Sequence, residues 1–135
     1  RKLLFPEAPD QPVLSGQVLW NALVKTDALQ QQVHAPGDVL FHVFGEDGKA
    51  FLAFDTGEGY TSWYLTQMEA RLPENFRIEK NIGGFGCTGT LEYLKETFKG
   101  WSEVQSVLDA TSEAEIFERR MFDREPLQSW TSARG

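Results

Sequence analysis

The glycine-rich run GFGCTG at 84–89 is the feature of this sequence that comes nearest to a phosphate-binding loop. Its spacing fits G-x-G-x-x-G, and a helical pattern follows it. A dinucleotide site also needs a buried strand directly before the glycines and an acidic residue about 20 positions later, within a βαβ unit. The preceding residues RIEKNI (77–82) are polar and poorly suited to a buried strand. We therefore interpret 84–89 as a loop and not as a cofactor site.

Carboxylates could in principle supply a general acid and a general base. The candidates are Asp55, Glu58, Asp109, Glu113 and Glu115. All five fall at expected turns and helix ends, where acidic residues are favoured for conformational and dipole reasons. We expect structural roles for them, and the sequence predicts no catalytic residue.

The sequence also gives little support for a metal site or for a catalytic nucleophile. His34 and His42 lie eight positions apart without a companion at ligand spacing, so no metal site is predicted. Cys87 is the single cysteine, which favours a reducing compartment. Ser15 precedes Gly16, but no nucleophile elbow surrounds it.

Length and composition bound the remaining functions. The 135 residues suffice for one domain, 1–135, and the 41% hydrophobic and 24% charged residues are ordinary for a globular fold. The net charge of −7 disfavours nucleic acid, and no apolar stretch approaches the roughly 20 residues of a transmembrane segment. Ten Phe, four Trp and three Tyr indicate either a tightly packed sheet, which we favour, or an apolar ligand surface.

The first half of the chain predicts strands. Residues 13–24 form the first, with a bulge at Gly16, and Thr26 or Asp27 caps a short helix over 28–33. Residues 38–44, 50–55 and 60–67 form an antiparallel meander whose turns contain Asp-Gly and Glu-Gly. Both faces of the third strand of this meander carry aromatic residues, so we expect the sheet to be covered on both sides.

The second half predicts helices and one more strand. Apolar residues over 91–108 recur at three- and four-residue steps, and Gly100 divides them into two helices. Ser112 and Glu115 have capping-box spacing, and 116–124 reads as a strand. The fold class is therefore α+β, an antiparallel (mixed) β-sheet with a few helices packed on one side. The role of 69–90 stays open.

The strand over 116–124 carries a dense charged cluster, Arg119, Arg120, Asp123 and Arg124. One interpretation is a charged outer face, with Asp123 and Arg124 paired at the end of the strand. The other places an arginine against an anionic or polarised group at the sheet edge.

The segment 101–130 resembles the FAD-dependent monooxygenases of the para-hydroxybenzoate hydroxylase type, in the branch of salicylate hydroxylase and zeaxanthin epoxidase. The matching features are Gly100–Trp101, Ala110–Thr111, Ile116, Asp123–Arg124, Pro126 and Trp130. The Ser15–Gly16 strand with Trp20, and AFDTGEGYTSWYLT at 53–66, are similar to the family's middle domain. Asn21 stands where many members carry arginine, which weakens any carried-over anion-binding role.

The resemblance implies a substrate-binding segment that lies between flavin-binding segments missing from this chain. Arg1–Pro6 is similar to the stretch after the family's Asp-Gly motif, and Arg134–Gly135 to the stretch before its Gly-Asp motif. The implied cofactors are FAD, held by the complete protein and not by this chain alone, and NAD(P)H or another reductant. Reduced flavin reacts with O₂ and transfers one oxygen atom to a small apolar or aromatic substrate.

In such enzymes the sheet of the middle domain covers the flavin and walls the substrate pocket. The resemblance thus makes bulky apolar residues on these strands the pocket candidates, namely Phe54, Trp63, Leu65 and Met121, and Arg119 a candidate for polar contact near the cofactor. The zeaxanthin epoxidase pattern would place the protein in a plastid. Two alternatives remain open: a non-catalytic structural or linker subunit in a larger assembly, and a module that binds an apolar ligand such as a pigment.

Overall fold

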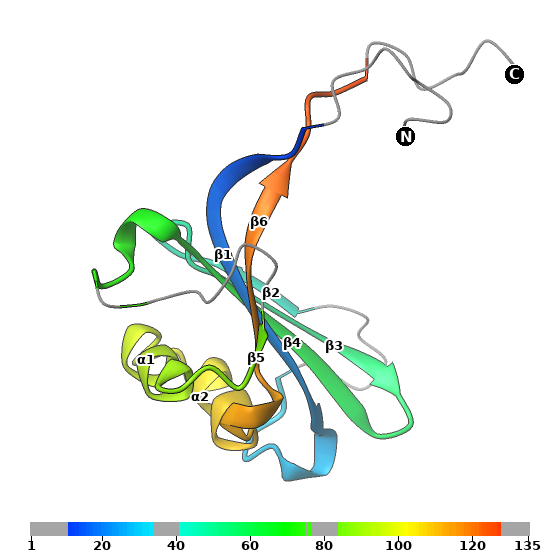
Figure 1. Ribbon diagram of the computed structural model, residues 1–135. Coiled ribbons are helices and arrows are strands. Elements are labelled where there is room, and N and C mark those ends of the chain that lie inside the picture. The colour runs from blue at the N-terminus through cyan, green and yellow to red at the C-terminus, as the bar shows by residue number, and fades with distance from the viewer. Residues whose placement is uncertain (1–10, 34–40, 75, 77–83, 128–135) are drawn as a thin grey trace, which may run out of the picture.

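The computed structural model describes residues 11–33, 41–74, 76 and 84–127. Six antiparallel strands form one sheet in the order β2-β3-β4-β1-β6-β5, with two helices on one side (Figure 1). The strands are β1 (Val13–Lys25), β2 (Phe41–Phe44), β3 (Ala50–Gly57), β4 (Tyr60–Met68), β5 (Gly84–Phe85) and β6 (Phe117–Asp123). The helices are α1 (Thr90–Thr97) and α2 (Ser102–Asp109). The predicted α+β class is confirmed.

The long strand β1 organises the sheet because it pairs with β4 on one side and with β6 on the other. Its register with β6 shifts between Leu14 and Val18, and Gly16 at the shift has φ +77°. A β-bulge with glycine in the left-handed region explains both, so the predicted bulge is confirmed. Beyond the bulge, β1 and β6 continue as a two-stranded ribbon that rises above the rest of the sheet (Figure 1).

The meander β2–β3–β4 forms as its turns predict. Asp47 and Gly48 have φ of 58° and 70°, and Glu58 and Gly59 have 55° and 77°. Tight hairpins require such positive φ values, which glycine adopts without a steric penalty. The two turns therefore fix how β3 aligns with its neighbours.

The helices cover one face of the sheet and bury its core. Gly100 has φ +89° and separates α1 from α2, as the sequence predicted. Side chains of both helices pack on alternate residues of β1, β3 and β4. The fully buried residues at the centre include Trp20, Phe51, Trp63, Leu65 and Phe98. Among the described residues, no helix has the length and apolar character to cross a membrane.

The prediction of a helix over 28–33 is wrong. Only a 3-10 turn forms, η1 (Thr26–Ala28). The backbone N–H of Gln31 donates to Ser106 Oγ, and that hydroxyl donates to the carbonyl oxygen of Gln31. This tertiary contact with α2 engages both backbone groups of Gln31, so they are not free to continue the local helix. The two remaining 3-10 turns are η2 (Glu69–Arg71) and η3 (Glu113–Glu115), and η3 has the predicted Ser112–Glu115 capping box.

The expectation that both faces of the sheet are covered is not met within the described part of the chain. The helices and residues 69–74 lie over one face, and no described helix lies over the other (Figure 1). Phe44 on that second face is 75% exposed and Phe85 is 69% exposed. We call this second face the open face.

Candidate functional site

Strand register assembles an aromatic row across the open face. Directly paired residues lie on the same face of a sheet, so the partners can be followed from edge to edge. Phe85 pairs with Phe117, Phe117 with Asn21, and Asn21 with Tyr64. Tyr64 in turn pairs with Leu52, and Leu52 with His42. The row thus crosses all six strands, with the neutral amide of Asn21 near its middle.

Two aromatic pairs stabilise this surface. The rings of Phe54 and Tyr64 are stacked, with centroids 5.8 Å apart and an interplanar angle of 14°. The rings of Phe85 and Phe117 lie 4.8 Å apart at 52°. Such pairs hold their rings in fixed orientations. No described helix covers them, and Phe85 is exposed while the other three rings are partly exposed, so they present apolar surface outward, as a ligand or partner site does.

The polar groups of the open face are mostly uncharged. Ser62 pairs with Phe54 and lies two positions along β4 from Tyr64, the partner of Asn21. Arg119 pairs with Leu19 and is exposed. Since Ser62 is buried, a ligand against the middle of this face would meet the amide of Asn21, with the guanidinium of Arg119 nearer the β6 side.

The structure divides the predicted pocket residues between the two faces. Phe54, Arg119 and Met121 lie on the open face, by their pairing and by strand alternation. Trp63 and Leu65 lie on the helix-covered face and are fully buried. The Trp63 indole N–H donates to Thr111 Oγ1 over 3.0 Å, which ties it to the end of α2. Phe54, Arg119 and Met121 thus share a surface, and Trp63 and Leu65 belong to the core behind it.

The acidic residues set aside as structural occupy structural positions. Asp55 accepts from the backbone N–H of Gly57 in the β3–β4 turn. Glu113 Oε2 accepts from the N–H groups of Gly89 and Leu91 at the start of α1. Asp109 pairs with Lys95 over 2.7 Å, between the two helices. None of these contacts forms an acid/base pair.

Glu118 is a buried carboxylate that the sequence did not single out. It is 1% exposed, and its Oε2 accepts from Trp20 Nε1 over 3.1 Å and from Thr90 Oγ1 over 3.0 Å. Its Oε1 is buried without a hydrogen-bond partner among the described residues. The alternation of β6 places Glu118 on the face opposite Phe117, but only the pairing with Trp20 shows that this face is buried.

The described residues contain no group of three or more His, Cys, Asp and Glu that could hold a metal ion. His42 lies against Phe44 with ring centroids 3.9 Å apart, and His34 falls outside the described residues. Gly84 and Phe85 form β5, which pairs antiparallel with β6. The first two residues of the glycine run thus lie in an antiparallel strand, whereas a dinucleotide cradle has its glycines between a parallel strand and a helix.

Comparison with known proteins gives relatives for nearly the whole chain. No family model matches it. It is 27% identical to chloroplastic zeaxanthin epoxidase of an Oncidium hybrid cultivar, over 99% of this chain and 18% of the relative. It is 28% identical to that of Prunus armeniaca, over 96% of this chain and 17% of the relative. The chain thus spans less than a fifth of the length of these curated relatives.

Solved structures share the fold. HpxO of Klebsiella pneumoniae, in complex with FAD and uric acid, superimposes with a TM-score of 0.66 at 22% identity, over 93% of this chain and 28% of that one. A salicylate hydroxylase substrate complex gives a TM-score of 0.56 at 15% identity, over 93% of this chain and 31% of that one. The chain is therefore similar in sequence to a segment of the zeaxanthin epoxidases and shares the fold of a segment of HpxO and of salicylate hydroxylase, which confirms the resemblance seen in the sequence.

Proposed function

We propose that this chain is the substrate-binding portion of a FAD-dependent monooxygenase, a hydroxylase or epoxidase, and that it is inactive without flavin-binding segments. The observation that carries the proposal is the open face, an aromatic surface with a neutral centre on a sheet whose other face is packed. The homologous relatives extend far beyond the matched segment, which leaves ample chain for binding the flavin.

The residues of the open face suit a planar ring system and not the phosphates of FAD. Tyr64, Phe54 and Leu52 offer apolar surface, while the described residues contain no dinucleotide cradle. When bound in the complete protein, FAD would carry out the transfer of an oxygen atom from O₂ to the substrate. The electrons would come from NAD(P)H or another reductant. The open face would exclude water and orient a small apolar or aromatic substrate, and Arg119 would contact a polar group near the cofactor.

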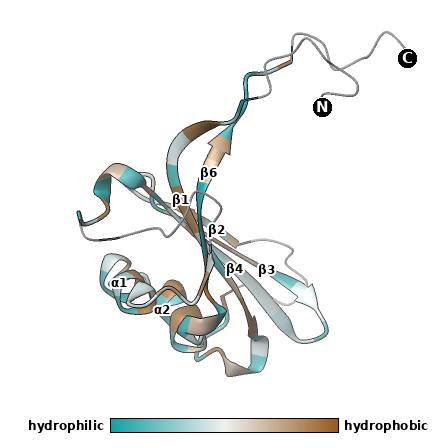
Figure 2. Ribbon diagram, viewed as in Figure 1, coloured by the Kyte–Doolittle hydropathy of each residue, from teal (hydrophilic) through white to brown (hydrophobic). Residues whose placement is uncertain are grey.

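The topology supports a sheet that covers a ligand held by other polypeptide, and not a sheet that encloses a ligand by itself. Within the described part of the chain, the sheet ends at the edge strands β2 and β5 and does not close into a barrel around a ligand. The ribbon of β1 and β6 carries exposed apolar residues, with Val13 62%, Leu14 47% and Phe122 40% exposed. Hydrophobic colour marks part of this ribbon in Figure 2. Exposed apolar residues of this kind suit contact between the ribbon and another polypeptide segment.

Expression of the full-length gene product and its absorption spectrum test the proposal. We expect a yellow protein with flavin absorption bands at about 370 and 450 nm. A colourless full-length product would instead indicate a non-catalytic linker subunit. A pigment or lipid that copurifies with the chain in equal amount would indicate a carrier. The chloroplastic relatives support a plastid location for the protein, which a fluorescent fusion would test.

A further inference from the structure

The side-chain amide of Asn21 lies near the middle of the aromatic row on the open face. Asn21 pairs with Tyr64 of β4 on one side and with Phe117 of β6 on the other, and all three residues are partly exposed. Along β1, its neighbours on the same face are Leu19 and Leu23. Apolar and aromatic side chains therefore border the amide both along the strand and across it.

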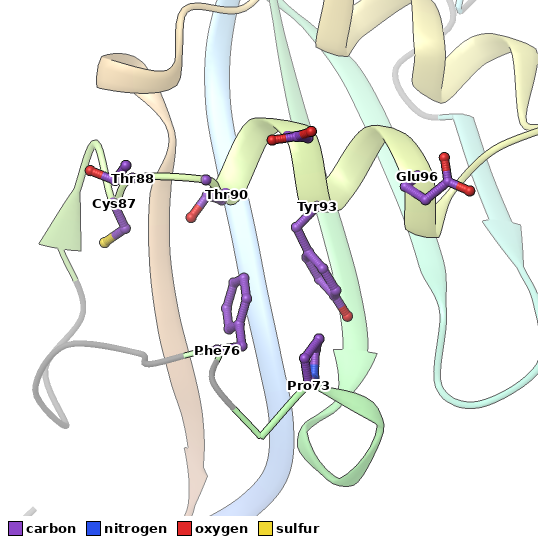
Figure 3. A pocket seen from close by; sticks show the side chains of 9 residues that line it. Pro73, Phe76, Cys87, Thr88, Thr90, Tyr93 and Glu96 are labelled. Atoms are coloured by element: carbon purple, nitrogen blue, oxygen red, sulfur yellow. The ribbon is translucent and has the colours of Figure 1, made fainter.

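Two polar aromatic side chains on the helix-covered face donate to partners within the protein. The Trp20 indole N–H donates to Glu118 Oε2, and the Tyr93 hydroxyl donates to Gln67 Oε1 over 2.7 Å. Figure 3 shows Tyr93 on that side of the sheet, with its ring beside the ring of Phe76. Both donors thus join the helices to the sheet, and neither is available to a ligand.

The Asn21 amide differs from these groups, because its side chain has no hydrogen-bond partner within the described part of the chain. An amide offers an oxygen that accepts and an NH₂ group that donates. A polar ligand group that meets this amide on an apolar surface loses its water and needs a hydrogen bond in return. A hydroxyl, carbonyl or carboxamide group can form that bond.

The charges around Asn21 disfavour an anionic group at the same place. The nearest charged residue on the described open face is Arg119, which pairs with Leu19, two positions along β1 from Asn21. Arg119 is exposed, so water screens its charge. The ring faces of Tyr64 and Phe117 are electron-rich, and the net charge of the chain is −7. A carboxylate at Asn21 would thus lose its hydration without gaining a paired cation.

We propose that Asn21 determines the substrate class of the open face, namely an uncharged ring system that carries a hydroxyl, carbonyl or carboxamide group. This inference rests on the proposed function, because it takes the open face as the substrate-binding surface. Tyr64 and Phe117 are separated by two strand spacings, roughly 10 Å. A bicyclic ring system is long enough to contact both, while the Asn21 amide between them hydrogen-bonds to its polar group.

Three probes of similar size test this selectivity in the full-length, flavin-loaded protein. They are 2-naphthamide, 2-naphthoate and 2-methylnaphthalene, and the change in the flavin absorption bands measures their binding. At neutral pH only 2-naphthoate is charged. We expect 2-naphthamide to bind at least about fivefold more tightly than 2-naphthoate, because the carboxylate loses more hydration free energy on this surface.

Variants of Asn21 locate the selectivity. Asn21→Leu keeps the size of the side chain but removes its hydrogen bonds, and should weaken 2-naphthamide binding about fivefold or more without weakening 2-methylnaphthalene binding. Asn21→Arg adds a guanidinium and should reverse the order, so that 2-naphthoate binds more tightly than 2-naphthamide. Gln17→Leu is the matched control, since it removes an amide from β1 four positions away, opposite Met68, and should change neither affinity.

The outcomes separate this inference from the proposed function. A full-length protein without flavin, or flavin bands that respond to none of the three probes, would contradict both. Circular dichroism and flavin content confirm that each variant is folded. If the flavin bands respond but 2-naphthoate binds as tightly as 2-naphthamide, or if folded Asn21→Leu keeps the full affinity for 2-naphthamide, the role of Asn21 alone is overturned.

Discussion

Trp20 and Glu118 face each other across neighbouring strands, and the indole N–H of Trp20 donates to Glu118 Oε2 over 3.1 Å in the buried core. The same oxygen accepts from Thr90 at the start of α1. A single carboxylate thus links β1, β6 and α1. This link holds together the neighbouring strands β1 and β6 and the helix that begins at Thr90.

Glu118→Ala should destabilise the protein by about 3 kcal/mol, because it leaves the Trp20 and Thr90 donors buried without an acceptor and creates a cavity. Glu118→Gln should cost clearly less, since the amide oxygen can accept from both donors. The free energy of unfolding in urea measures both effects. Equal losses for the two variants would show that the hydrogen bonds contribute little.

The Trp63–Thr111 pair provides a second buried link. Thr111 Oγ1 accepts from Trp63 Nε1 over 3.0 Å and donates to the Val107 carbonyl over 2.6 Å. Thr111→Val keeps the shape but removes the hydroxyl, and should cost about 1–3 kcal/mol of unfolding free energy. Thr111→Ser keeps the hydroxyl and should cost less. If Thr111→Val were as stable as Thr111→Ser, the hydroxyl would have no stabilising role.

Glu113 should stabilise the start of α1. Its Oε2 accepts from the N–H groups of Gly89 and Leu91, which have no partner within the helix. Glu113→Ala is therefore expected to lower the unfolding free energy by about 1 kcal/mol. Glu103→Ala is a control on the first turn of α2, where Glu103 accepts only from Ser102 Oγ. Thermal denaturation should show the larger decrease for Glu113→Ala, and the reverse order would contradict the capping role.

Gly48 and Gly57 have similar backbone conformations, so alanine substitutions at the two positions distinguish the cost of steric crowding from the cost of backbone strain. Gly48 and Gly57 have φ of +70° and +81°. An added Cβ at Gly48 would lie 2.7 Å from Met68 Cγ, whereas at Gly57 it would meet nothing within 4 Å. Gly57→Ala should cost about 1 kcal/mol for the backbone conformation alone, and Gly48→Ala should cost at least about 1 kcal/mol more. Equal unfolding free energies would mean that Met68 moves aside freely.

Local signals in the sequence predicted most elements. The Asp47–Gly48 and Glu58–Gly59 turns set the meander, and Gly100 divided the helices, because each glycine acts on its own neighbourhood. The exact register within the β3–β4 hairpin could not be predicted in the same way, because the pairing shifts between Asp55 and Gly57 beside the turn. Phe54 pairs with Ser62 and not with Trp63, so two pocket candidates that looked alike in sequence lie on opposite faces.

Tertiary contacts account for the remaining differences. The helix expected over 28–33 is replaced by hydrogen bonds between Gln31 and Ser106, 75 positions apart. Glu118 gave no signal of burial in the sequence, because a glutamate on a strand normally faces water. Its position became evident only once Trp20 and Thr90 were placed around it.

The absorption spectrum of the flavin in the full-length protein, titrated with apolar aromatic and epoxidisable substrates, tests the substrate-binding role of the open face. Tyr64→Ala removes aromatic surface from the middle of the open face, and Phe44→Ala removes it from the edge strand β2. We expect a substrate-induced change in the flavin bands whose half-saturating concentration rises about tenfold or more in Tyr64→Ala and little in Phe44→Ala. An unchanged titration in a folded, flavin-loaded Tyr64→Ala protein would show that substrate does not lie against the open face.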